Sequence, residues 1–244
     1  KYAVEKEPLG TGGAIRNAAK LLDTNKSVVI LNGDVLSSHN LSEQIRQHET
    51  NDADVTLHLT QVEDARAFGC VPTDKDGRVS AFLEKMENPI TNQINAGCYV
   101  FNPRVISSIP LDTVVSVERE TFPQLVASGA KVFGYLENAY WLDIGTPRAL
   151  LKASIDIVKR SGDFLAMPGS IIDPTAVITG GSCIGPDSLV GAGAHIDGSI
   201  IEAGSVIGPN AKISDSFVAT GAEVENNVKI TSSCVTNSEI LSIP

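Results

Sequence analysis

The chain has 244 residues, of which 42% are hydrophobic and 20% are charged, and its formal net charge is −10. This length suits one large domain or two modest ones, and the composition is ordinary for a globular protein. The negative charge argues against sequence-independent binding to nucleic acid, because the phosphate backbone would be repelled. The net negative charge is still compatible with a local basic pocket that binds a small phosphate ligand.

No stretch approaches the roughly 20 apolar residues that cross a bilayer. The start, KYAVEKEPLGTGG, has neither the basic cap nor the apolar run of a secretion signal. We therefore expect no membrane contact and a cytoplasmic location. The cysteines Cys70, Cys98, Cys183 and Cys234 are widely separated and form no CxxC pair. They suggest buried reduced thiols rather than a zinc site or a disulfide framework.

The first part of the chain alternates helix-like and strand-like stretches. In chain order, the sequence predicts a helix over residues 14–22, a buried parallel strand over 27–31 (SVVIL), a helix over 41–48 capped from 37–40, and a strand over 54–60 (DVTLHLT). Further strands are expected at 69–72, 79–84, 97–101 and 131–136, and further helices at 122–128 and 147–158. This alternation predicts an α/β layered domain whose ligands bind at the carboxyl ends of parallel strands.

A six-residue repeat follows. Aliphatic residues recur at Ile172, Ile178, Ile184, Val190, Ile196, Ile201, Ile207, Ile213, Val218, Val224, Ile230 and Val235, and the step shortens to five at three places. Four positions after them come the small residues Ala176, Ser182, Ser188, Ala194, Ser205, Ala211 and Ala222, with Ile200, Phe217, Val228 and Cys234 as larger exceptions. This period predicts a triangular coil of about four turns, similar to the left-handed parallel β-helix of hexapeptide-repeat proteins. A flexible linker has no reason to keep its aliphatic residues in phase.

The composition changes where the repeat begins. Residues 165–244 hold ten glycines, a single aromatic residue, Phe217, and only two cations, Lys212 and Lys229. We therefore expect an α/β domain over residues 1–164 and a β-helix domain over residues 165–244.

Two carboxylates stand beside tight turns in distant parts of the first domain. Asp34 ends the motif NGD, directly after the apolar strand, and Asp143 lies in the motif WLDIGTP. Two such carboxylates could share one Mg²⁺, which prefers a few acidic ligands plus phosphate oxygens. The alternative for each is a turn or helix cap.

Three further motifs carry groups suited to a phosphorylated ligand. The segment EPLGTGGA leads a glycine-rich stretch into a helix, where free backbone N–H groups could approach an anionic or flat ligand. Glu84 and Lys85 end a strand, and the lysine could act as a point charge on a phosphate. The motif NAG at residues 95–97 offers an amide and a glycine for close approach. Each motif taken alone is also compatible with a turn or a solvated strand end.

The order and spacing of these motifs are more specific than any one of them. PLGTGGA, NGD, the pair Phe68 and Gly69, EK, NAG and WxDIGTP together resemble the nucleotidyltransferase domain of the NDP-sugar pyrophosphorylases. The run SVERETFP at residues 116–123, with the repeat that follows, is most similar to the branch of that family that makes GDP-mannose. The resemblance implies a Rossmann-like nucleotidyltransferase domain followed by a left-handed parallel β-helix.

The resemblance also implies a role for each motif residue. Pro8, Leu9, Gly10, Thr11 and Gly12 would line the nucleobase, and Gly69, Glu84, Lys85, Asn95, Ala96 and Gly97 would surround the sugar phosphate. Asp34 and Asp143 would hold Mg²⁺, and Asp34 and Lys85 would be the catalytic residues. In the implied reaction, a phosphate oxygen of the sugar 1-phosphate attacks the α-phosphorus of an NTP, GTP in the mannose branch, and expels pyrophosphate.

The chain departs from the family pattern in two places. Members of the family open with a glycine-rich, Arg-containing loop, GGxGTRLRPLT, and a Pro-Lys-Pro segment, neither of which occurs in this sequence. Met86 stands where the family usually has proline after the Glu-Lys pair. We expect that an N-terminal piece is not included, rather than that the gene product is short, because an exposed apolar strand edge would aggregate.

Several alternatives remain open. The sugar and base could be glucose 1-phosphate with dTTP or UTP, or the chain could be a non-catalytic subunit that binds the nucleotide sugar. An acyltransferase would use a histidine in the coil, but His195, the one histidine there, lies in an unbroken hexad and is expected to face solvent. We expect the chain to form a homo-oligomer, and the coil to mediate association or regulation.

Overall fold

The computed structural model describes residues 1–23 and 25–244, which form two compact units, Lys1–Trp141 and Leu142–Pro244. None of the helices in this described part of the chain is long and apolar enough to cross a bilayer. The first unit contains α1 (Gly10–Ala18) with a 3-10 turn (Ala19–Leu21), β1 (Val28–Leu31), β2 (Val35–Ser37), α2 (Leu41–Thr50), β3 (Val55–Gln61), β4 (Gly69–Cys70), β5 (Leu83–Glu84), β6 (Gln93–Phe101), α3 (Pro103–Ser108), a π-helical turn (Val117–Thr121), α4 (Phe122–Ala127) and β7 (Val132–Leu136). Strand β8 (Trp141–Asp143) spans the division between the units.

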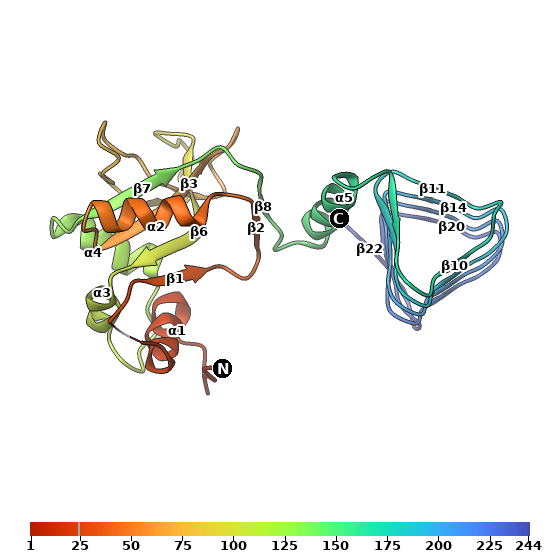
Figure 1. The fold of residues 1–244 in the computed structure, drawn as a ribbon, viewed down its shortest axis with the longest axis horizontal. Helices are drawn as coiled ribbons and strands as arrows, with labels where there is room; N and C mark the ends of the chain where they lie inside the picture. The colour runs from red at the N-terminus through yellow and green to blue at the C-terminus, as the bar shows by residue number, and fades with distance from the viewer. Residues whose placement is uncertain (24) are drawn as a thin grey trace. The chain divides into compact units, whose positions relative to one another are not determined.

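The first unit is built on a mixed sheet of six strands in the order β5-β4-β6-β3-β7, with β1 also paired to β6 (Figure 1). Strands β3 and β7 are parallel, whereas β1, β3 and β4 all run antiparallel to β6. The prediction of a buried parallel strand at residues 27–31 is therefore wrong in two respects. Strand β1 pairs antiparallel with β6 and is only half-buried, and Leu31 at its end is 63% exposed. The partner lies far along the chain, so the apolar run could not reveal the direction of pairing.

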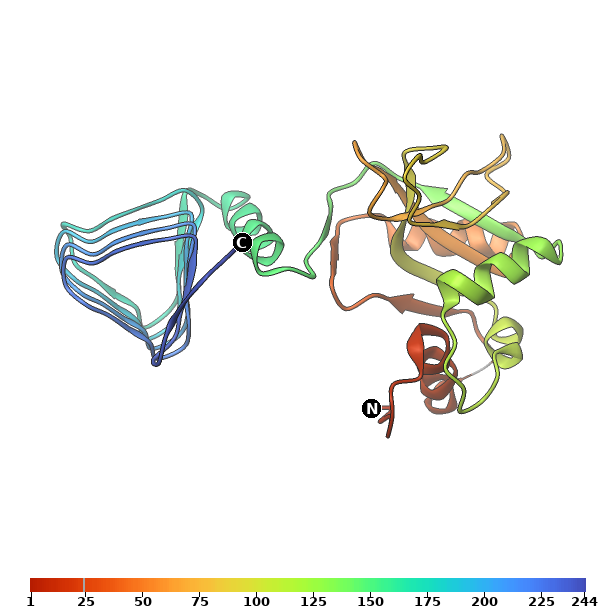
Figure 2. The same cartoon turned by 180° about the vertical axis from the view of Figure 1, so that it is seen from behind.

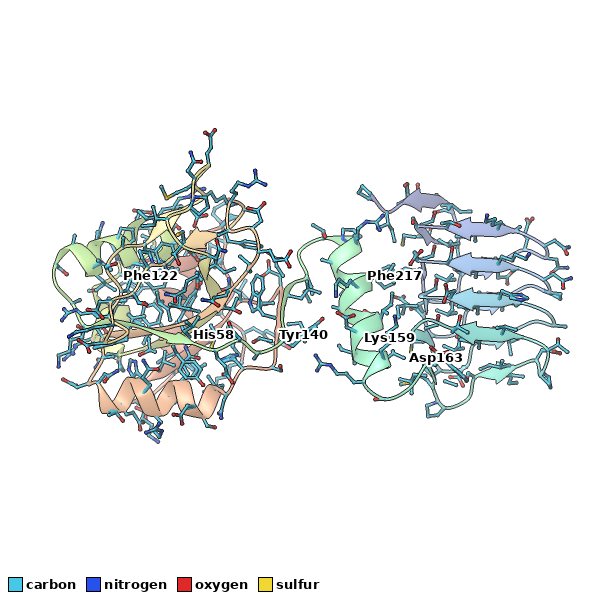
Figure 3. All side chains as sticks on the ribbon, turned by 90° about the horizontal axis from the view of Figure 1, so that it is seen from above. His58, Phe122, Tyr140, Lys159, Asp163 and Phe217 are labelled. Carbon is cyan, nitrogen blue, oxygen red and sulfur yellow. The ribbon has the colours of Figure 1, made fainter. Side chains whose placement is uncertain are left out.

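Helices cover both faces of this sheet, with α2 on one face and α4 on the other (Figures 1 and 2). On one face, the apolar side chains of β3 join a core in which Phe122 is fully buried (Figure 3). On the other face, polar side chains of β3 lie under α2. Gln44 donates from Nε2 to the backbone oxygen of Thr56 at 3.1 Å, and His48 Nδ1 lies 3.0 Å from Thr56 Oγ1. The alternation of β3 thus matches an apolar core to one side and a buried polar layer to the other.

Most of the predicted elements of this unit exist, with altered ends. Helix α2 begins where expected, and the side chain of Asn40 caps it by accepting from Glu43 N at 3.2 Å. Helix α1 begins at Gly10 instead of residue 14, so the glycine-rich stretch forms its first turn. The strand predicted at 79–84 shrinks to β5, whereas β6 begins four residues before the predicted start at Gly97. Helix α3, capped by Asn102 with Pro103 in its first turn, was not predicted.

The second unit contains one helix and a coil of short strands. These are α5 (Pro147–Lys159), β9 (Phe164–Ala166), β10 (Ile171–Ile172), β11 (Val177–Thr179), β12 (Ser182–Ile184), β13 (Leu189–Val190), β14 (His195–Asp197), β15 (Ile200–Ile201), β16 (Val206–Ile207), β17 (Lys212–Ser214), β18 (Phe217–Val218), β19 (Glu223–Val224), β20 (Lys229–Thr231), β21 (Ser233–Val235) and β22 (Ile240–Ser242). The strands stack into three sheets that form a triangular coil, seen end-on in Figures 1 and 2 and from the side in Figure 3. All pairs from β9 to β21 are parallel, and only β22 turns back antiparallel on β21. The predicted parallel β-helix is confirmed.

The predicted aliphatic repeat fills the inside of the coil, where every one of its residues after Ile172 is buried. The small residues four positions after these aliphatic residues are also buried, apart from the half-buried Ala176. Where the step shortens to five, the corners hold the fully buried Ser199 and Ser216, and the larger Ile200 and Phe217 beside them are only half-buried. The backbone N of Ser216 donates to the hydroxyl of Ser199, 17 residues earlier, at 3.1 Å, and Ser199 donates likewise to Ser182. Each serine hydroxyl thus satisfies a backbone donor in the next turn.

Helix α5 packs on the sheet of the coil that contains β9, β12 and β15. Between Gly181 and this helix there is no room for a side chain, because a Cβ would lie 2.8 Å from the Ile155 methyl group. The compact units accordingly divide at Trp141, so that the helix predicted at the end of the first domain belongs to the compact unit of the coil. The cysteines are all free thiols, with Cys70 and Cys98 buried and Cys183 and Cys234 half-buried.

Candidate active site

At the centre of the sheet of the first unit, a short stretch of β6 is unpaired on one of its two edges. On one side of β6, β4 pairs with Ile94 and β1 pairs from Cys98 onward. Between these two pairings, residues 95–97 have no strand beside them on that edge among the described residues. The motif NAG therefore lies between the ends of two neighbouring strands, where Asn95 is half-buried and Ala96 and Gly97 are buried.

The backbone is distorted at the same place. Against β3, the register moves from Leu57 opposite Tyr99 to Leu59 opposite Asn95, so β6 carries extra residues in a bulge. Gly97 sits in this bulge with φ +75, a left-handed conformation that favours glycine. Asn95 Oδ1 accepts from Gly97 N at 3.2 Å, and this hydrogen bond stabilises the bulged backbone.

The motif NGD lies against this bulge. The backbone N of Asn32 donates to the oxygen of Gly97 at 2.8 Å, and a Cβ on Gly97 would lie 3.1 Å from Asn32 Nδ2. Asn32 follows the carboxyl end of β1, so Asp34 is carried at that strand end as the sequence predicts. The carboxylate of Asp34 is exposed, and it has no hydrogen-bond or ion-pair partner within residues 1–23 and 25–244.

A buried tyrosine joins the two asparagines of these motifs. Asn95 donates from Nδ2 to the hydroxyl oxygen of Tyr99 at 2.8 Å, and the ring of Tyr99 is 1% exposed. Burial raises the pKa of Tyr99, while hydrogen bonds with Asn95 and Asn32 oppose that rise. Tyr99 therefore stays a neutral anchor for both motifs at ordinary pH.

The sugar-phosphate residues predicted on β4 and β5 lie on the next strands of the sheet. Gly69 is paired with Glu84, and a Cβ on Gly69 would lie 2.9 Å from Glu84 Oε2, so the missing side chain makes room for the carboxylate. Lys85 follows with φ 42, a conformation that is strained for a residue other than glycine, and its backbone N donates to Phe68 O at 3.3 Å. Such strain is characteristic of functional positions.

Trp141 is a site residue to which the sequence pattern assigned no role. Its indole Nε1 donates to the backbone oxygen of Ala96 at 2.9 Å, and its ring meets Phe68 edge-on with ring centroids 5.5 Å apart. Trp141 thus links the NAG motif on β6 to Phe68, the residue before Gly69. The only available signal was its place in the WLDIGTP motif.

The predicted nucleobase segment packs against the start of the π-helical turn. Gly12 N donates to Val115 O at 2.8 Å, and Val115 N donates to Leu9 O at 2.9 Å. Thr11 donates from Oγ1 to Glu118 Oε2 at 2.7 Å. Glu118 in turn lines a cavity of about 530 Å³ together with Glu84 and Lys85. Glu118 therefore connects the two predicted sets of residues, because it is hydrogen-bonded to Thr11 and lines the cavity of Glu84 and Lys85.

The predicted metal ligands lie in different compact units. Asp34 belongs to the first unit and Asp143 to the second, where its Oδ1 accepts from Gly145 N at 2.9 Å. In the described part of the chain, no group of three or more His, Cys, Asp or Glu side chains could hold a metal ion. A pair of carboxylates completed by substrate phosphate remains a prediction.

The mixed sheet with a bulged central strand in the first unit and the parallel β-helix in the second unit fit a nucleotidyltransferase domain followed by a β-helix. Residues 1–160 match the family model described as nucleotidyl transferase, and the chain belongs to this family. Residues 160–241 match the model described as GMPPB C-terminal domain.

Curated relatives and a solved structure agree with this family. The chain is 46% identical over 211 residues to a mannose-1-phosphate guanylyltransferase of Mycobacterium tuberculosis, which covers 82% of this chain and 58% of the relative. It is 32% identical over 208 residues to mannose-1-phosphate guanylyltransferase 1 of Arabidopsis thaliana, which covers 80% of this chain and 57% of that protein. The chain thus spans less than two thirds of the length of these relatives. The crystal structure of HddC from Yersinia pseudotuberculosis complexed with GMP-PN is similar, with a TM-score of 0.54, 30% identity and coverage of 63% of this chain and 64% of that one.

Proposed function

We propose that the full-length protein transfers GMP from GTP to mannose 1-phosphate, giving GDP-mannose and pyrophosphate. The observation that carries this proposal is the arrangement around residues 95–97 of β6. They follow Ile94, which is paired with Cys70, and Gly69, the neighbour of Cys70 on β4, is paired with Glu84. The relatives named mannose-1-phosphate guanylyltransferase support the choice of mannose and guanosine nucleotide. Glucose 1-phosphate with dTTP or UTP is the competing pair.

The substrate itself supplies the nucleophile in this reaction, so the protein needs no catalytic serine or cysteine. A phosphate oxygen of mannose 1-phosphate attacks the α-phosphorus of GTP in line, and the bond to the pyrophosphate leaving group breaks. Glu84 accepts hydrogen bonds from sugar hydroxyls, and Lys85 places its ammonium on the sugar phosphate. Asn95, Ala96 and Gly97 on β6 orient the sugar. The protein acts through positioning and through stabilisation of charge on the phosphoryl oxygens.

We propose Mg²⁺ as the cofactor, held by Asp34 and Asp143. The donor set fits this ion, because Mg²⁺ binds hard carboxylate oxygens and takes its remaining ligands from water and phosphate. The exposed and unpartnered carboxylate of Asp34 supports the assignment, as does its place at the carboxyl end of β1. When bound, the ion neutralises charge on the phosphate oxygens.

Three further expectations remain proposals. We assign the catalytic domain to residues 1–164 and the coil to 165–244, with α5 at the end of the first of these ranges packed on the coil. The free thiols support a reducing, cytoplasmic compartment. We propose that copies of the chain associate through the coil, supported by a row of in-register apolar side chains on one of its faces, in which Ile171 and Leu189 are exposed and Val206 is half-buried. Changing Leu189 to Glu should then lower the oligomeric state in sedimentation.

The decisive experiment measures pyrophosphate released by the full-length gene product with each NTP and each sugar 1-phosphate. We expect the highest kcat/KM with GTP and mannose 1-phosphate, and loss of activity when Mg²⁺ is chelated. Turnover with another pair alone would overturn the assignment of substrates. Calorimetric binding of GDP-mannose without turnover on any pair would favour the regulatory subunit. The predicted exposure of His195 is confirmed.

A further inference from the structure

A second cation shares the cavity of Lys85. This cavity, of about 530 Å³, lies between the end of β5 and the start of the π-helical turn, and its polar lining consists of Glu84, Lys85, Glu118 and Arg119. Arg119 comes from a segment 34 residues beyond Lys85 in the chain. The two cations are therefore brought to one cavity by the fold.

The guanidinium of Arg119 has no ion-pair or hydrogen-bond partner in the part of the chain that the structure describes. The acidic residues on either side of it are engaged elsewhere. Glu118 Oε2 accepts from the hydroxyls of Thr11 at 2.7 Å and Ser116 at 2.9 Å, and Glu120 Oε1 accepts from Ser116 N at 2.9 Å. In a chain of net charge −10, a cation left unpaired between two carboxylates is available for an anionic ligand.

The backbone that carries Arg119 is held firmly. Its N–H donates to the hydroxyl of Ser116 at 3.2 Å, which caps the helical turn, and Val117 and Thr121 of the same turn are buried. A guanidinium displayed from a fixed backbone loses less freedom when it binds, and its planar fork matches two phosphate oxygens.

We propose that Arg119 binds the phosphate of the sugar 1-phosphate together with Lys85, an inference that rests on the proposed function. Glu84, at the same cavity, faces the hydroxyls of the sugar, so the three side chains recognise both ends of one hexose 1-phosphate. Lys85 contributes a point charge, and Arg119 contributes a bidentate contact that fixes the orientation of the phosphate. The alternative anion at this cavity is the phosphate chain of the NTP.

The test compares Arg119→Gln and Arg119→Lys with wild type in the full-length enzyme. The matched control is Arg46→Gln, because Arg46 lies on α2, pairs with Glu43 and lines none of the cavities described. We expect Arg119→Gln to raise the KM for mannose 1-phosphate about 10-fold to 100-fold and to leave the KM for GTP within about 2-fold. Arg119→Lys should have a KM for mannose 1-phosphate between those of wild type and Arg119→Gln, because lysine keeps the positive charge and lacks the planar guanidinium.

An unchanged KM for mannose 1-phosphate in Arg119→Gln would overturn the proposal, and so would an increase confined to the KM for GTP. Thermal unfolding of each variant checks that the fold is retained. If the wild-type enzyme turns over no substrate pair, the proposed function fails, and calorimetric titration with mannose 1-phosphate then tests Arg119 separately. In that titration, equal affinity of wild type and Arg119→Gln would overturn the inference, and weaker binding of the variant would support it.

Discussion

The buried His58 makes the stability of the first unit depend on pH. Its side chain on β3 is 1% exposed, and neither ring nitrogen has a hydrogen-bond partner among the described residues. The ring stacks on His39 with centroids 3.9 Å apart, and Tyr135 lies 6.4 Å away. Burial, with a smaller contribution from His39 and opposed by Glu137, lowers the pKa of His58 from 6.5 to about 4.

The sign of the effect follows from where the proton binds. In the unfolded chain His58 takes up a proton near pH 6.5, whereas in the folded chain it stays neutral down to about pH 4. Between these values the unfolded state binds more protons, so the free energy of unfolding falls as the pH falls. One pKa unit corresponds to about 1.4 kcal/mol. Acidification from pH 7.5 to 5 should therefore cost about 2 kcal/mol through His58, to which the buried His48, whose pKa is also lowered by burial, adds in the same direction.

The assay is urea unfolding of the 244-residue chain, followed by the fluorescence of Trp141, its only tryptophan. Wild type and His58→Leu are compared at pH 7.5 and pH 5, and the difference between the two pH values is the readout, so a uniform effect of the substitution cancels. The variant should lose about 2 kcal/mol less than wild type on acidification. The matched control, His195→Leu on the exposed face of the coil, should behave as wild type. Equal losses in wild type and His58→Leu would refute the reasoning.

Other predictions concern the site and the coil. Gly69→Ala places a Cβ 2.9 Å from Glu84 Oε2, so the KM of the full-length enzyme for the sugar phosphate should rise about 10-fold; unchanged kinetics would contradict the role of Glu84. Thr11→Val removes the 2.7 Å hydrogen bond to Glu118 and should lower the free energy of unfolding by about 1–2 kcal/mol in urea, whereas no change would show that the contact adds no stability. Ile207→Ala, at a coil position 1% exposed, should cost about 2–5 kcal/mol by calorimetry, and a much smaller loss would argue against a tightly packed coil.

The coil was the most predictable part of the fold, because each hexad repeats the same local problem of burying one aliphatic side chain. Even there, Ser199 and Ser216 escaped prediction. Their role depends on a hydrogen bond to the next turn, 17 residues away, and the shortened step moves the corner by one position. The pattern of aliphatic residues carries no sign of that shift.

The sheet was less predictable, because pairing depends on residues far apart in the chain. An apolar run at β1 predicts a strand but cannot say that its neighbour is β6 or that the pair is antiparallel. The bulge that contains Gly97 arises from the register between β3 and β6, which no short motif encodes. Trp141 was missed for the same reason, since its indole contacts residues distant in sequence. Arg119 was missed because only the fold brings it to the cavity that Lys85 lines.

The central claim is that Lys85 and residues 95–97 of β6 bind the sugar phosphate in a guanylyltransferase. It is tested most directly by the rate at which the full-length protein forms GDP-mannose from GTP and mannose 1-phosphate. Lys85→Met should lower kcat/KM by about 100-fold or more, while Lys75→Met, at an exposed lysine that lines none of the cavities described, should match wild type. Full activity in Lys85→Met would contradict the account.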